Sequence, residues 1–248
     1  MKKVQQGLRE GWFEQSAPLN RRSVELTGEE KRLKELLKSS LFAEGRLSPQ
    51  ILNITSDVMP LAHEFVGRKP IALVFENKEP YNVARSVLEN LPDAPYGILA
   101  YGNGGSFVDS VRDFLRIQNS KRYQEFFDKS LEQIHYVGDI DWAGLRIARG
   151  ASLKTEKYGL PPLVPAVGIH RLMLDSLQHS RILHPDGFPD DKIKKARIAD
   201  SSLVEWLPAE VQEEILRILN LNNRIPEEML TEESILNLWN AQKNTYLI

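Results

Sequence analysis

The sequence predicts an α/β fold in which a parallel sheet is covered by helices on both faces. Short apolar runs, typical of strands buried on both sides, recur between residues 70 and 167, and stretches of helical length separate them. The regions before and after this part of the chain have helical patterns. With 248 residues, 42% of them apolar, the chain is long enough for one or two domains with a sizeable core.

Residues 1–66 are predicted to form a mostly helical N-terminal region. The stretch 27–37 begins with Thr27 as an N-cap and places its leucines on one face. A second helix is expected over residues 48–66. None of these residues has catalytic spacing, so we interpret the region as a helical appendage.

Residues 67–184 are predicted to form the α/β domain. Four strands are expected at the apolar runs 71–75, 97–101, 134–137 and 163–167, the last of them weakened by a proline. Helices are expected at 81–90, 106–118, 143–158 and 170–179. Strands and helices that alternate in this way form βαβ units with parallel strands.

Residues 185–248 are predicted to form a helical C-terminal region. The segment 185–191 is rich in Pro, Gly and Asp, which is typical of a linker with turns. An amphipathic helix is expected at 208–219, with a proline and acidic residues in its first turn.

Composition excludes several classes of protein. The absence of cysteine excludes disulfides, thiolate metal sites and cysteine nucleophiles. No apolar run approaches the roughly 20 residues that a membrane span needs. The basic residues at the N-terminus precede no apolar stretch, which predicts a cytoplasmic protein without a membrane partner. The net charge is −2, with an acidic excess after residue 200, so any contact with DNA is expected to be local or shared with a partner.

Three carboxylates follow two of the predicted strands. Glu76 comes directly after the first strand, and Asp139 and Asp141 follow the third. Parallel strands end at the same edge of a sheet, where ligands bind, so these side chains are expected to gather there. Carboxylates gathered in this way repel one another unless they are protonated or bridged by cations. Their oxygens are ligands that suit Mg²⁺ or Mn²⁺. An ion held in this way can activate water for attack on a phosphodiester.

Other interpretations of the same residues remain open. Asp141 alone is equally well explained as the N-cap of the following helix. The motif at 139–141 also permits a haloacid-dehalogenase-type phosphatase, although its position on the third strand and the following Trp142 disfavour that class. The glycine-rich turn at 102–105 lacks the third small residue of a dinucleotide-binding fingerprint, and we interpret it as a tight turn.

The order of these motifs resembles that of the Toprim domain of topoisomerases, primases and nucleases. Within that group, VFENK at 74–78 and HYVGDIDWAGL at 135–145 resemble the JetD nuclease subunits of Wadjet anti-plasmid systems, which are similar to the type VI topoisomerase A subunit. The resemblance covers about residues 70–180. The late segment NRIPEE at 223–228 is similar to an Arg-x-Glu-Gln-Glu segment of the same family.

The resemblance implies a Toprim-like sheet and cleavage of double-stranded DNA with Mg²⁺ or Mn²⁺. It implies that Glu76, Asp139 and Asp141 are the catalytic and metal-binding acids, with Glu76 alternatively a general acid or base. Glu228 of the late segment is a further candidate ligand. Family members act as dimers beside a condensin-like (SMC-type) motor complex in defence against plasmids or phages, and these are the expected partners.

Basic residues near the predicted site are candidates for phosphate contacts. We select Lys78, which follows the first strand, and Lys194 and Lys195 from the densest basic run. Residues 1–66 are too short for the arm and winged-helix module of the family nucleases. This departure leaves open an alternative function, a non-catalytic Toprim module that binds DNA or a motor complex.

Overall fold

The computed structural model describes residues 2–39, 42, 49–55, 60–180, 184, 186–189 and 200–245. Its contacts divide the chain into two compact units, Met1–Val58 and Met59–Ile248. In the described residues, no helix has both the length and the apolar character needed to cross a membrane.

The first unit is a small helical body. Its elements are α1 (Lys2–Arg9), α2 (Leu19–Thr27), α3 (Arg32–Leu36), the 3₁₀ helix η1 (Pro49–Leu52) and a short parallel pair of strands, β1 (Ala17–Pro18) and β2 (Ile54–Thr55). Phe13, Leu26 and Leu33 are among its buried residues. Thr27 is the last residue of α2, which Gly28 ends at a φ of 80°, so the prediction that Thr27 begins a helix was wrong.

The predicted helix over residues 48–66 was also wrong. The described part of this range holds η1, β2 and the strand β3 (Ala62–Phe65). β3 pairs antiparallel with β5 (Ile98–Tyr101), so cross-strand pairing overrides the local helical pattern. Residues 62–65 therefore belong to the sheet of the second unit.

The second unit is a mixed α/β structure with a central five-stranded sheet, in agreement with the predicted fold class. The strand order is β3-β5-β4-β6-β7, and the three further strands are β4 (Ile71–Phe75), β6 (Gln133–Val137) and β7 (Leu163–Pro165). All neighbouring pairs are parallel except β3 with β5. The parallel part was predicted, whereas the antiparallel edge strand was not.

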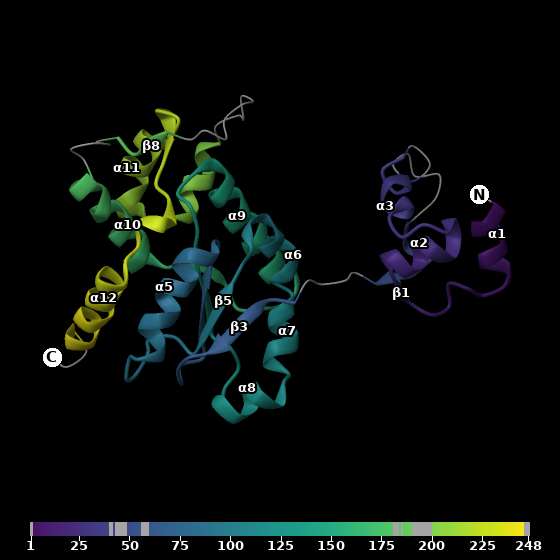
Figure 1. Cartoon of the computed structure of the whole chain (residues 1–248), viewed down its shortest axis with the longest axis horizontal. Coiled ribbons are helices and arrows are strands. Elements are labelled where there is room, and N and C mark those ends of the chain that lie inside the picture. The colour runs from purple at the N-terminus through teal and green to yellow at the C-terminus, as the bar shows by residue number, and fades with distance from the viewer. Residues whose placement is uncertain are drawn as a thin grey trace. The chain divides into compact units, whose positions relative to one another are not determined.

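The central strand β4 is buried on both faces, and alternate residues enter two separate cores. Leu73 and Phe75 pack in the core that includes α5 (Lys78–Glu89), α10 (Val167–Ser180) and α12 (Glu232–Thr245). Ala72 and Val74 pack in the core formed with the helices that follow β5 and β6. Those helices are η2 (Gly104–Ser106), α6 (Phe107–Ser110), α7 (Asp113–Gln118), α8 (Lys121–Phe126) and α9 (Trp142–Lys157). Figure 1 shows α6 and α7 on the side of the sheet away from α5.

The C-terminal elements pack on the same unit as the sheet. They are β8 (Phe188–Pro189), η3 (Ser201–Trp206), α11 (Ala209–Asn220), β9 (Asn223–Arg224), η4 (Glu227–Met229) and α12. Ile140 forms an antiparallel bridge with Ile225, which joins the segment after β6 to the segment after β9. This bridge brings a late part of the chain to the carboxyl ends of the parallel strands.

Candidate active site

Glu76 lies at the carboxyl end of β4 and is held there by three hydrogen bonds. Its backbone N–H donates to the carbonyl of Val137 at 2.9 Å, which continues the pairing of β4 with β6. Its backbone carbonyl accepts a hydrogen bond from the N–H of Gly104 at 3.1 Å. The hydroxyl of Tyr136 donates to Glu76 Oε2 at 2.8 Å. The side chain of Glu76 is only 9% exposed, so its position is set by the protein interior.

Two glycines make room for the Glu76 carboxylate and the peptide of Asp139. A Cβ atom on Gly138 would lie 2.4 Å from Glu76 Oε2, which is far inside van der Waals contact. A Cβ atom on Gly144 would lie 2.2 Å from the backbone oxygen of Asp139. A side chain at position 144 would therefore displace backbone, and one at position 138 would displace the carboxylate of Glu76.

Asp139 follows β6 and is almost completely buried. Its Oδ2 accepts from Arg224 Nη1 at 2.7 Å, and its Oδ1 accepts from the backbone N–H of Glu227 at 3.1 Å. Both donors come from the late segment that the Ile140–Ile225 bridge brings to this edge. With both oxygens engaged, Asp139 is poorly placed to attack a phosphoryl group as a nucleophile.

Glu227 is the fully buried member of the acidic cluster, at 0% exposure. Its Oε1 accepts from the backbone N–H of Asn77 at 2.5 Å, and its Oε2 is buried without a hydrogen-bond partner. Burial raises the pKa of Glu227 well above its ordinary value, and the negative charges of Glu76 and Asp139 raise this pKa further. Glu76, Asp139 and Glu227 therefore form one electrostatic group, which we call the acidic cluster.

Asp141 lies at the same edge, where it is the N-cap of α9. Its Oδ1 accepts from the backbone N–H of Gly144 at 2.6 Å, and the residue is 2% exposed. The N-cap interpretation is therefore confirmed. The N-terminus of a helix stabilises a negative charge, so the Asp141 carboxylate has a favourable environment without a metal ion.

The other candidates from the sequence lie elsewhere or outside the described residues. Glu228 is exposed and accepts from Asn77 Nδ2 at 3.3 Å, while its neighbour Glu227 points into the cluster. Lys78 is exposed at the first turn of α5, next to Glu76 and Asn77 in the chain. Lys194 and Lys195 lie outside the described residues.

Sequence reasoning missed three residues that build the site: Tyr136, Arg224 and Glu227. In the sequence Tyr136 is typical of a strand, and no local pattern predicts that its hydroxyl donates to Glu76. Glu227 was passed over in favour of its neighbour Glu228. The nearest signal is Pro226, the N-cap of the single turn η4, in which Glu227 is buried and Glu228 is exposed.

The net negative charge at this edge of the sheet favours the binding of a divalent cation. The acidic cluster and Arg224 together carry two formal negative charges when all three carboxylates are ionised. The oxygens of the cluster are hard ligands that suit Mg²⁺ or Mn²⁺, and Glu227 Oε2 is a buried acceptor without a donor. In the described part of the chain, however, no three acidic or histidine side chains are placed so that they could hold a metal ion.

The glycine-rich turn after β5 adjoins Glu76. Asn103 and Gly104 have φ values of 57° and 61°, so the prediction of a turn with left-handed backbone was correct. A Cβ atom on Gly104 or Gly105 would meet nothing within 4 Å. The Cβ positions of these two glycines therefore face open space.

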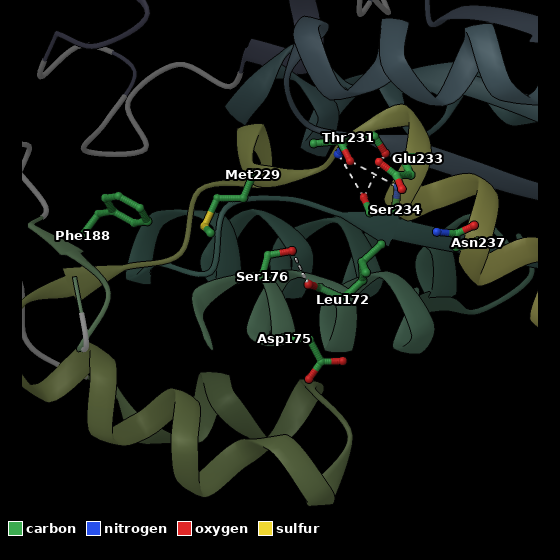
Figure 2. Close-up of a pocket in the computed structure, with 9 residues that line it drawn as sticks. All are labelled: Leu172, Asp175, Ser176, Phe188, Met229, Thr231, Glu233, Ser234 and Asn237. Atoms are coloured by element: carbon green, nitrogen blue, oxygen red, sulfur yellow. Dashed lines mark hydrogen bonds between the residues drawn. The ribbon is translucent and has the colours of Figure 1, made fainter. Parts of the chain in front are cut away.

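A separate groove lies beside the late segment, and its volume is about 580 Å³. Figure 2 shows its lining, which α10, β8, η4, α12 and the link before α12 provide: Leu172, Asp175, Ser176, Phe188, Met229, Thr231, Glu233, Ser234 and Asn237. Met229 belongs to the same turn as Glu227, and Phe188 pairs with Arg224 in the β8–β9 ladder. The groove therefore adjoins the segment that completes the acidic cluster.

Comparisons with protein-family models, curated proteins and solved structures found no match to this chain.

Proposed function

We propose that this chain is a divalent-metal-dependent DNA endonuclease with a Toprim-like domain, similar to the JetD subunits of Wadjet defence systems. The observation that carries the proposal is the acidic cluster at the carboxyl edge of the parallel sheet. A buried carboxylate oxygen of Glu227 lacks a donor there, next to the charges of Glu76 and Asp139. Burying such charge without compensation is costly, so a cation that displaces the proton from Glu227 would stabilise the cluster.

The order of the acids along the sheet supports the Toprim assignment. Glu76 follows β4 and Asp139 follows β6, and these neighbouring strands are in register with Phe75 opposite Val137. A Toprim domain places its glutamate and its Asp-x-Asp motif in this order. Double-stranded DNA, a condensin-like complex and a second copy of the chain are the partners that the resemblance implies.

In this proposal Glu76, Asp139 and Glu227 would hold Mg²⁺ or Mn²⁺, and Asp141 would hold the start of α9 in place. The bound cation would supply Lewis-acid activation of water and neutralise charge on the phosphodiester. Tyr136 orients Glu76 through its hydroxyl, and the N–H of Asn77 orients Glu227. The open turn at Gly104 and Gly105 gives a phosphate access to the backbone beside Glu76.

A non-catalytic module is the second candidate, and one observation favours it. Arg224 already pairs with Asp139, and the described acids are not placed to hold an ion as they stand. In that case the cluster stabilises the fold, and the chain binds DNA or a motor complex without cutting.

A cleavage assay with supercoiled plasmid distinguishes the two candidate functions. We expect nicked or linear product in Mn²⁺ or Mg²⁺ from the wild type, and none from Glu76→Ala, Asp139→Asn or Glu227→Gln. Glu125→Gln is the matched control, because Glu125 is exposed on α8, a helix that contributes no residue to the acidic cluster. Cleavage that persists in all three cluster variants would refute the proposed site. No cleavage by the wild type together with no Mn²⁺ binding would favour the non-catalytic module.

A further inference from the structure

Arg224 occupies the place at Asp139 where a cation is expected. Its Nη1 donates to Asp139 Oδ2 at 2.7 Å, and Asp139 is 5% exposed. The Arg224 side chain is 26% exposed, so its guanidinium lies between a buried carboxylate and solvent. A guanidinium in this position neutralises Asp139 and can leave it toward water.

The backbone of Arg224 is fixed independently of its side chain. Arg224 pairs with Phe188 in the β8–β9 ladder. The next residue, Ile225, exchanges two backbone hydrogen bonds with Ile140, at 2.9 and 3.1 Å. The side chain can therefore change rotamer while the late segment, and Glu227 with it, stays in place.

A guanidinium and a divalent cation compete for the same carboxylate oxygens. Both are positive, and like charges at a shared buried carboxylate repel each other strongly in a medium of low dielectric constant. In the structure, Arg224 already engages one oxygen of Asp139.

We propose that Arg224 is an exchangeable counter-ion of the acidic cluster, which neutralises Asp139 without metal and leaves it when a divalent cation binds. This inference rests on the metal site proposed above. It makes the Arg224–Asp139 ion pair a built-in competitor of the metal, so that the pair sets the cation concentration at which the site fills.

The test measures Mn²⁺ affinity by calorimetry for the wild type and for Arg224→Met, which replaces the stem of the side chain and removes its charged guanidinium group. We expect Arg224→Met to bind Mn²⁺ at least about tenfold more tightly, a change of about 1.4 kcal/mol. The matched control is Arg217→Met, which removes the same charge from an exposed ion pair with Asp186. Its affinity should equal that of the wild type.

Arg224→Gln provides a second variant that keeps a hydrogen-bond donor for Asp139, in case the methionine variant does not fold. It should also bind Mn²⁺ more tightly than the wild type. Unchanged or weaker binding in the folded Arg224 variants, with binding by the wild type, would overturn the counter-ion role and leave the metal site standing. No binding by any of the proteins would overturn both proposals. Tighter binding without plasmid cleavage would support the counter-ion role and count against the nuclease.

Discussion

Substitution of Gly144 by alanine tests whether the site dictates glycine at the start of α9. The new Cβ atom would lie 2.2 Å from the backbone oxygen of Asp139 and 3.3 Å from Glu76 Oε2. Because the nearest atom belongs to the backbone, it cannot turn aside like the end of a flexible side chain. Such overpacking costs about 1–3 kcal/mol, and the better helix propensity of alanine offsets about 1 kcal/mol of this. We expect a net loss of up to about 2 kcal/mol in the free energy of unfolding relative to the wild type.

Gly150→Ala is the matched control on the same helix. Its Cβ atom would meet two methyl groups of Val108 at 3.4 Å, which is ordinary contact, so alanine should stabilise α9 by up to about 1 kcal/mol. Urea denaturation of both variants and the wild type, followed by circular dichroism, measures the difference. If Gly144→Ala is as stable as Gly150→Ala, the Asp139 peptide is not held where we place it, and the geometry of the acidic cluster is wrong.

Three further predictions concern the hydrogen bonds and protons of the same unit. Tyr136→Phe removes the donor to Glu76 and should lower the free energy of unfolding by about 1.5–3 kcal/mol in urea, since the acceptor is a buried carboxylate. Glu227→Gln should stabilise the metal-free protein at pH 7–8 by about 1–3 kcal/mol, because the neutral amide avoids the cost of burying a third negative charge beside Glu76 and Asp139. Because burial raises the pKa of Glu227, folding favours its protonated form, and this gain should vanish as the pH falls toward 4. Burial pushes the pKa of Asp113 up, but hydrogen bonds from Arg116 and the N–H of Leu61 outweigh it and lower this pKa. Asp113→Asn should therefore cost about 1–2 kcal/mol at pH 7, a loss that shrinks below the ordinary aspartate pKa near 4; equal losses at pH 7 and pH 3 would contradict this assignment.

Local sequence patterns are enough to predict the parallel part of the sheet and the edge at which Glu76 and Asp139 lie. IALVF at 71–75 is apolar throughout because β4 is buried on both faces, and such a run can be recognised without knowledge of its neighbours. The positions of Glu76 and Asp139 at the same edge then follow from the parallel arrangement alone, since parallel strands end together. The N-cap role of Asp141 is local as well, because it depends on a residue only three positions away.

The residues that complete the site come from distant parts of the chain, so local patterns do not predict them. Glu227 meets Asn77 across 150 residues of chain, and Arg224 meets Asp139 across 85. Both contacts depend on the bridge between Ile140 and Ile225, which no local periodicity encodes. The edge strand β3 was not predicted, because it too depends on a contact with a distant part of the chain. β3 pairs with β5, and this long-range pairing overrides the local helical propensity on which the prediction was based.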